Sequence, residues 1–147
     1  MNPKDILRFL PYTAPFLFVD DLTAVNENGI TGTCTYSKDA WFYRGHFKDH
    51  PVTPGVILTE TMAQIGVVCL GIYLLGDTIT AISKPLVAFS SFEMEFLAPV
   101  LPGETVTVTS QKKYFRFNKL KCAVEMKNSL DRVVCSGTIA GIIKFDH

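Results

Sequence analysis

Two histidines and one glutamate are the residues best suited to proton transfer in this 147-residue chain. His46 and His50 lie in an irregular, aromatic-rich segment, and Glu60 follows within an apolar run that begins at Val56. An ionised, unpaired carboxylate in apolar surroundings costs on the order of several kcal/mol, so Glu60 must be paired, protonated or open to a cavity. Such surroundings raise the pKa of a carboxyl group, as suits a general acid. Gln64 is four residues further on, where it can hydrogen-bond to Glu60 on one helix face.

These residues also have purely structural interpretations. A histidine in an aromatic loop often serves packing alone, and a glutamate in an apolar helix can pair with a lysine or with a second protein. The spacing of His46 and His50 is that of metal ligands on a helix, but Pro51 and Pro54 disfavour a helix there. The chain also lacks the nucleophile-elbow, phosphate-loop and dinucleotide-binding motifs.

The order of these residues favours chemistry. Gly45-His46-Phe47 is followed by Pro51-Val52-Thr53-Pro54-Gly55-Val56, which ends where a helix is expected to begin. The first N–H groups of a helix have no internal acceptor, and glycine lets a ligand carbonyl come close to the main chain. A base, an acid and the N–H of Gly55 as an oxyanion site together suit proton abstraction next to a carbonyl group.

A second group of polar residues lies in the C-terminal half, at Lys112, Lys113, Arg116, Lys119 and Lys121. The simplest interpretation is the solvated face of a hairpin. The functional alternative is that Lys112, Lys113 and Arg116 dock an acidic carrier protein, because a local basic patch steers an acidic partner whatever the net charge of the chain.

The elements that must position these residues follow from the hydrophobic pattern. Asn2 and Pro3 predict a short helix to about Phe9. Phe16–Val19 begins an extended run that leads through an Asn28-Gly29 turn to a strand over Ile30–Tyr36. From Val56 to about Leu75 the residues are apolar all round, which predicts a helix covered on every side, with Gly66 and Gly71 allowing close packing.

After Pro85 the pattern predicts four long strands. They are Leu86–Leu97, Glu104–Asn118, Lys121–Lys127 and Arg132–Lys144, with turns at Leu101-Pro102-Gly103, Asn118-Lys119 and Asn128–Asp131. The predicted fold class is α+β, a single domain over residues 1–147 in which one antiparallel sheet wraps around a long central helix.

Composition excludes several classes of protein. With 48% hydrophobic and 19% charged residues the chain is not disordered. Its 14 basic and 14 acidic residues balance, so nucleic acid is not expected as a partner. The nearly all-apolar stretch Ile65–Leu75 is shorter than the roughly 20 residues of a bilayer span, so no membrane partner is expected. The absence of a secretory signal and of C-x-x-C pairs predicts a cytoplasmic protein with unpaired thiols.

The segment GHFKDHPVTPGVILTETMAQIG resembles the signature of the FabZ-type 3-hydroxyacyl-acyl-carrier-protein dehydratases, roughly G-H-F-P-x-x-P-V-M-P-G-V-L-x-x-E-A-M-A-Q. LPYTAPFLFVDDL and FEMEFLAPVLPGE are similar to two further segments of that family. The three matches fall in the family's order and span most of the chain.

This resemblance implies a hot-dog fold and a homodimer, possibly a trimer of dimers. Each site would combine the catalytic His46 of one subunit with the catalytic Glu60 of the other, and related dehydratase-isomerases carry Asp at the second position. The Gly55 N–H would bind the thioester carbonyl, His46 would remove the C2 proton, and Glu60, oriented by Gln64, would help the C3 hydroxyl leave as water. Phe47 would contact the substrate. The partner would be acyl carrier protein bearing a (3R)-3-hydroxyacyl chain, and no metal or redox cofactor would be needed.

The sequence departs from the family pattern at four places. Tyr12-Thr13 replaces His-Arg, Ala14 replaces an aromatic residue, Lys48 replaces Pro and Thr53 replaces Met. These departures leave the acid and base in place, and they make a specialised acyl chain, such as a polyene or another secondary lipid, an open alternative to ordinary fatty-acyl chains. Two other functions stay open: a hot-dog thioesterase, which would direct water to the carbonyl carbon, and a non-catalytic acyl-binding subunit.

Overall fold

The central helix is the element around which the others are arranged. In the computed structural model, which describes residues 1–79 and 84–146, this helix runs from Gly55 to Leu75 in three continuous segments. They are α2 (Gly55–Ala63), η2 (Gln64–Cys69, a π-helical turn) and α3 (Leu70–Leu75). Every residue from Thr61 to Ile72 is buried, as the continuous apolar pattern predicts.

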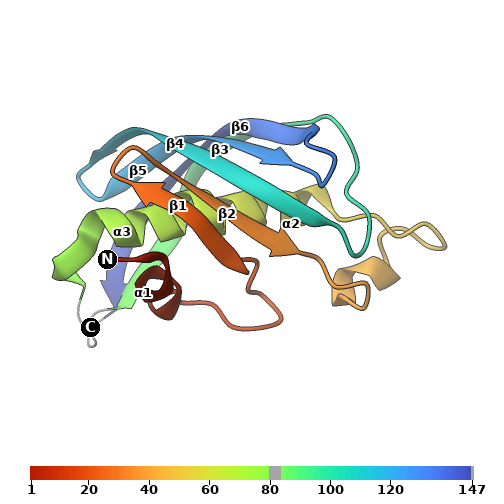
Figure 1. Ribbon diagram of the computed structural model, residues 1–147, viewed down its shortest axis with the longest axis horizontal. Coiled ribbons are helices and arrows are strands. Elements are labelled where there is room, and N and C mark those ends of the chain that lie inside the picture. The colour runs from red at the N-terminus through yellow and green to blue at the C-terminus, as the bar shows by residue number, and fades with distance from the viewer. Residues whose placement is uncertain (80–83, 147) are drawn as a thin grey trace.

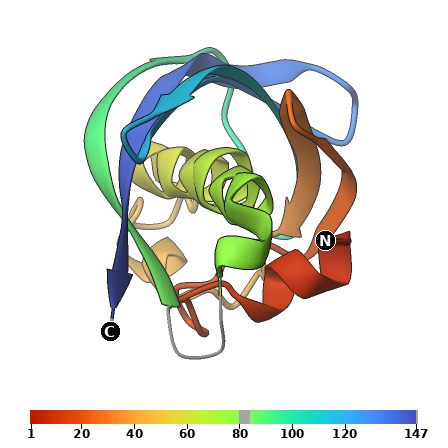
Figure 2. The same cartoon turned by 90° about the vertical axis from the view of Figure 1, so that its left-hand side faces the viewer.

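Six strands form one antiparallel sheet that curves around this helix, which confirms the predicted fold class (Figures 1 and 2). The order of the strands across the sheet is β1-β2-β4-β5-β6-β3, so β1 and β3 are its edges. The strands are β1 (Asp21–Asn26), β2 (Gly29–Thr35), β3 (Lys84–Phe96), β4 (Thr105–Arg116), β5 (Lys119–Lys127) and β6 (Val133–Asp146).

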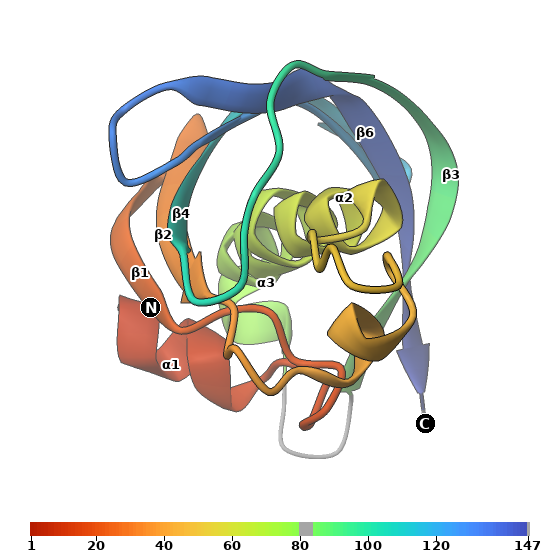
Figure 3. The same ribbon diagram turned by 90° about the vertical axis from the view of Figure 1, so that its right-hand side faces the viewer.

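Three short helices complete the described chain: α1 (Pro3–Arg8), η1 (Trp41–Arg44) and η3 (Gly76–Thr78). The predicted start of α1 is confirmed, because the Asn2 side chain accepts from the Asp5 N–H and the Asp5 side chain accepts from the Asn2 N–H. Seen from the end in Figure 3, α1 and the loop that carries η1 lie on the side of the central helix that the sheet leaves open.

Glycines let the helix approach the sheet closely, as predicted. The Ser110 hydroxyl of β4 donates to the Gly66 carbonyl at 2.9 Å, and a Cβ on Gly66 would lie 3.0 Å from side-chain atoms of Ser110 and Val124. A Cβ on Gly71 would lie 2.7 Å from the end of Ile143. Strand side chains can therefore pack directly against the helix backbone, because these two helix positions carry no side chain of their own.

The prediction that the helix is covered on every side is wrong at its first two turns. Val56 is 76% exposed and Glu60 is only half-buried. Both side chains line an open groove whose other walls come from the segment before β1, from η1 and from β3.

Two other local predictions also need correction. The segment Phe16–Val19 is not a strand, and β1 begins only at Asp21, because Phe16 and Phe18 direct main-chain groups to the side chain of Gln64. The β1–β2 turn falls one residue earlier than predicted. The Asn26 side chain accepts from the N–H groups of Asn28 and Gly29 and so closes the turn.

The four cysteines are buried free thiols, as expected. Gly55–Thr78 is long and apolar enough to cross a membrane, but 83% of its most apolar window is buried inside the fold. Burial of this kind is what the core helix of a sheet-wrapped protein shows.

Substitution of Gly137 should test how tightly β3 is held in the sheet. Gly137 of β6 lies opposite Met94 of β3, and a Cβ there would stand 1.9 Å from the Glu93 carbonyl oxygen. Because a main-chain oxygen in a paired strand cannot move aside freely, Gly137→Ala should lower the free energy of unfolding by about 2–3 kcal/mol in chemical denaturation. Gly45→Ala is the control, since a Cβ on Gly45 meets nothing within 4 Å. Equal losses in the two variants would contradict this packing.

Candidate active site

Glu60 lies on the open face of α2 and is half-buried. The residues on either side of it, Thr59 and Thr61, are buried, as are Ile57, Leu58 and Met62. Burial raises the pKa of the Glu60 carboxyl group, and a hydrogen bond from Gln64 acts in the opposite direction. The helix therefore presents a carboxyl group that holds its proton more tightly than an exposed glutamate does.

Gln64 fixes the position of Glu60. Its side-chain amide is completely buried, and its nitrogen donates to the Glu60 carboxylate at 3.0 Å and to the Phe16 carbonyl at 3.1 Å. Its oxygen accepts from the Phe18 N–H at 2.8 Å. The predicted Glu60–Gln64 contact is confirmed. The sequence did not reveal that the same amide also ties the segment before β1 to the helix.

His46 lies in the loop between η1 and α2, and its ring is half-buried. Its Nδ1 is 2.9 Å from the Val52 carbonyl oxygen. Because a carbonyl only accepts, Nδ1 must carry the proton of the neutral ring, which leaves a lone pair on Nε2. The Phe47 ring stacks on the imidazole with centroids 4.0 Å apart. In that tautomer Nε2 is the nitrogen that can accept a proton, as a general base requires.

The loop that carries His46 is anchored at its end by Thr53. The Thr53 side chain is buried and its hydroxyl is 2.6 Å from that of Tyr43, while its N–H donates to the Val100 carbonyl at 2.8 Å. His50, in contrast, is exposed and exchanges only main-chain hydrogen bonds with Phe47. Among the described residues, no three histidine, cysteine or carboxylate side chains gather as a metal site would require.

Gly55 is the first residue of α2. The N–H groups of Ile57 and Leu58 donate to the Pro54 carbonyl, whereas no acceptor within the described chain contacts the Gly55 N–H. A Cβ on Gly55 would lie 3.1 Å from the Phe96 ring, so glycine leaves room beside this N–H. The Gly55 N–H is therefore free to donate to the oxygen of a ligand, and its role as an oxyanion site stays a prediction.

An apolar groove of about 640 Å³ connects Gly55 with Glu60. Aromatic rings from three parts of the chain supply most of its walls. The lining residues are Phe16, Trp41, Gly55, Val56, Ile57, Thr59, Glu60, Phe89, Phe92 and Phe96. Glu60 is the only ionisable side chain among them, so the groove suits a long apolar ligand that brings one polar group to that carboxyl.

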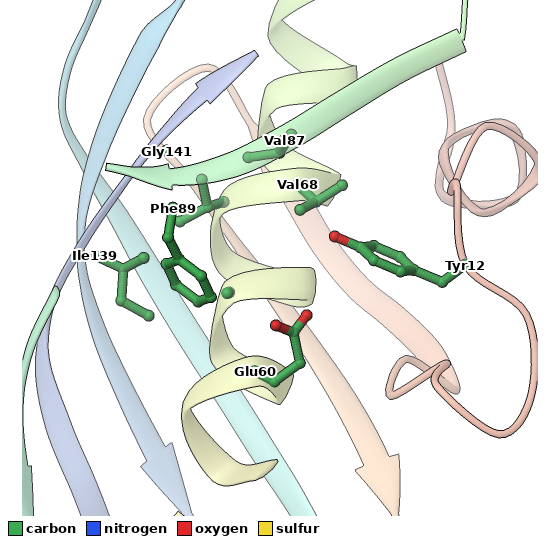
Figure 4. A pocket seen from close by; sticks show the side chains of 9 residues that line it. Tyr12, Glu60, Val68, Val87, Phe89, Ile139 and Gly141 are labelled. Carbon is green, nitrogen blue, oxygen red and sulfur yellow. The ribbon is translucent and has the colours of Figure 1, made fainter. Parts of the chain in front are cut away.

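Glu60 also borders a smaller pocket of about 40 Å³ between the helix and strands β3 and β6 (Figure 4). Tyr12 closes one side of this pocket with its phenol pointing inward. Burial, together with the nearby Glu60 charge, raises the pKa of Tyr12 to about 12, so the phenol stays neutral. In the sequence Tyr12 stands out only as a departure from a family pattern, and no local signal places it beside the acid.

His46 borders neither of these cavities, and no hydrogen bond within the described chain joins it to Glu60. The structure thus brings together Glu60, Gln64 and Gly55, and holds His46 and Phe47 in a separate loop.

Lys112, Lys113 and Arg116 lie at the end of β4, in the hairpin that joins β4 to β5. This hairpin and the η1 loop are at opposite ends of the central helix (Figure 1). The Arg116 guanidinium lies over the Tyr114 ring, 4.3 Å from its centroid. The turn itself is Phe117-Asn118, one residue earlier than predicted. Arg116 pairs with Lys119 across the hairpin, and both residues between them have positive φ.

Comparison with known proteins shows what this chain is similar to. Residues 10–135 match a family described as "FabA-like domain". The chain is 30% identical over 133 residues to the 3-hydroxyacyl-[acyl-carrier-protein] dehydratase FabZ of Ehrlichia chaffeensis, covering 88% of this chain and 87% of that protein. It is also 30% identical over 146 residues to the protein of the same name from Acinetobacter baumannii, covering 97% of this chain and 89% of that protein.

Two solved structures share the fold. The dehydratase heterocomplex ApeI:P from Xenorhabdus doucetiae matches with a TM-score of 0.79 at 17% identity, covering 98% of this chain and 92% of that chain. A thioesterase from Haemophilus influenzae matches with a TM-score of 0.67 at 14% identity, covering 98% and 91%. The architecture is the hot-dog fold.

Burial of Glu60 has a measurable consequence for stability. A carboxyl group whose pKa is raised by folding stabilises the folded state below its ordinary pKa, and that contribution is lost as the pH rises through the folded pKa. Glu60→Gln removes the charge and should therefore gain stability relative to the unaltered protein as the pH rises from about 4 to about 8. Denaturant unfolding at several pH values measures the difference, and Glu27→Gln, in an exposed turn, is the control. A difference that shrinks with rising pH would contradict the assignment.

Proposed function

Since this chain belongs to the FabA-like family and matches FabZ-type dehydratases over most of its length, we propose that it is a 3-hydroxyacyl-acyl-carrier-protein dehydratase. The reaction removes water from a (3R)-3-hydroxyacyl thioester and leaves the trans-2-enoyl thioester. The observation that carries this proposal is Glu60, a carboxyl group of raised pKa held by Gln64 at the wall of an apolar groove that also contains the Gly55 N–H. The reaction takes place in the cytoplasm and uses no cofactor.

Each residue has one task in the proposed elimination. The Gly55 N–H donates to the thioester oxygen, which stabilises the negative charge that develops when a C2–H bond breaks. His46 takes the C2 proton on Nε2, since its Nδ1 proton is already donated to Val52. Protonated Glu60 gives its proton to the C3 hydroxyl as the C–O bond breaks, so water leaves. Afterwards His46 returns a proton to Glu60 through solvent, and the enzyme is reset.

The proposed site is shared between two protomers. Edge strand β3 carries the exposed rings of Phe89, Phe92 and Phe96 beside the groove. A second copy pairing with β3 would cover these rings and bring its own η1 loop to the groove. His46 of one protomer then serves Glu60 of its partner, which accounts for their separation within one chain, and the acyl chain runs along the apolar interface.

Carrier docking is proposed on the basic hairpin, through Lys112, Lys113 and Arg116. The lysine and arginine side chains supply the charge that attracts an acidic carrier. Because of the four departures from the family pattern, the substrate series includes specialised acyl chains, such as a polyene or another secondary lipid, as well as ordinary fatty-acyl chains.

The direct test is an assay with a 3-hydroxyacyl thioester on acyl carrier protein, following enoyl formation and free thiol together. Enoyl product without thiol release is expected, and His46→Ala and Glu60→Gln should each lower kcat by roughly 10²–10⁴-fold, the usual contribution of a general acid or base. If saturated chains give neither product, polyene-type chains are tested next.

The matched control is His50→Ala, because His50 lies in the same loop and its side chain is exposed. It should keep nearly full activity. Thiol release by the unaltered protein would identify a thioesterase instead. Folded His46→Ala and Glu60→Gln variants with full activity would overturn the assigned roles.

A mixing experiment tests the shared site. His46→Ala and Glu60→Gln are each expected to be inactive, but after subunit exchange a mixed dimer holds one site with both intact groups. Random assortment restores about a quarter of the sites, and activity should recover to about that fraction. If both groups acted within one chain, every site would keep a defect and mixing would restore nothing.

A further inference from the structure

The turn between β4 and β5 contains a residue that its backbone does not favour. Phe117 and Asn118 form a two-residue turn with φ of 51° and 60°. Left-handed φ at both positions favours Gly, which has no Cβ to crowd the following carbonyl oxygen, and Asn, whose short polar side chain can hydrogen-bond locally. Asn118 suits this requirement, but Phe117 does not. A bulky aromatic residue therefore occupies a turn position where it costs stability.

The fold does not recover this cost through contacts of the ring. Phe117 is 97% exposed, the most exposed of the large hydrophobic residues in the described chain. The ring pairs seen among the described residues do not include it. The positive φ of this position and its exposure to water both favour a small polar residue. Any stabilising contact of the Phe117 ring must therefore come from outside the protomer.

The chain segment on either side of Phe117 carries only positive charge. Between Lys112 and Lys121 the hairpin carries five cationic side chains and no carboxylate. The ion pairs of the described chain involve Arg8 and Lys127 and none of these five. The tip thus presents one apolar ring surrounded by unpaired positive charges. This combination fits an acidic protein with an apolar depression in its surface.

We propose that Phe117 is the anchor through which this hairpin docks an acidic acyl carrier protein, its ring entering an apolar depression while the surrounding cations meet carboxylates. This proposal rests on the proposed function, which requires a carrier to bind and leave in every turnover. An exposed ring has no contact within the protomer to break on docking, and a central aromatic residue often dominates such small interfaces.

Within one protomer the hairpin and Gly55 lie at opposite ends of the central helix (Figure 1). Docking at the hairpin therefore recognises the carrier at a distance from Glu60, and a binding measurement can follow it apart from the chemistry.

The experiment compares carrier-bound substrate with a small thioester mimic. Phe117→Asn removes the ring and places a favoured residue in the turn, so the variant folds at least as well as the parent. Its kcat/KM for carrier-bound substrate should fall roughly tenfold, the effect of losing one anchor residue, while its kcat/KM for the mimic stays unchanged. Leu130→Asn is the matched control, since Leu130 is a 73% exposed residue in the β5–β6 turn. It should change neither value.

Direct binding of the carrier protein, without turnover, keeps this inference separate from the proposed function. The unaltered protein should bind the carrier, and both Phe117→Asn and the charge reversal K112E/K113E should weaken binding, the latter with a smaller dependence on salt. Equal binding by Phe117→Asn and the parent would overturn the proposal. So would attachment of the parent to anionic phospholipid vesicles that Phe117→Asn abolishes while carrier kinetics stay unchanged, because the ring would then serve a membrane surface. Absence of dehydration with normal carrier binding would count against the proposed function alone.

Discussion

The helix from Gly55 to Leu75 is surrounded by apolar residues, and yet it carries one carboxyl group into those surroundings. The fold can hold Glu60 there because Gln64 satisfies one of its oxygens and the groove leaves the carboxyl open to a ligand. The same amide binds main-chain groups of Phe16 and Phe18, which would otherwise be left without partners. One buried side chain thus positions the acid and also fixes the segment that leads into β1. The two tasks are linked, since that segment supplies two of the three hydrogen bonds that hold the Gln64 amide in place.

The shape of the sheet decides where chemistry can occur. Its six strands surround most of the helix, but the η1 loop, not a strand, covers the side near Gly55 (Figure 3). The groove opens at this boundary, between the helix and edge strand β3. A carboxyl group anywhere between Thr61 and Ile72 would be fully enclosed, and ionising it would cost far more. Glu60 lies just before that enclosed stretch, where partial burial raises its pKa without shutting out a substrate.

The sequence predicted the elements well wherever a regular apolar period was present. The central helix, the four long strands after Pro85 and the capped helix at Pro3 all follow from periodicity and capping, because each buries one defined face. Predictions were wrong where main-chain groups bond to a distant side chain. Phe16–Val19 has the residues of a strand, but Gln64 takes the hydrogen bonds that a strand partner would need. Both hairpin turns shifted by one residue, since Asn26 and the backbone of Phe117 set the turn geometry.

For the site, the sequence by itself determined the identity of the chemical groups: a carboxyl in an apolar helix, an amide four residues away, and a glycine at the helix start. Spacing along a helix fixes such neighbours before any tertiary contact forms. Only the tertiary structure decided which nitrogen of His46 is free, because that depends on the Val52 carbonyl. It alone placed Tyr12 and the rings of β3 beside Glu60, and it alone separated His46 from that carboxyl. Those contacts join residues far apart along the chain, and local sequence patterns do not determine how a curved sheet brings such residues together.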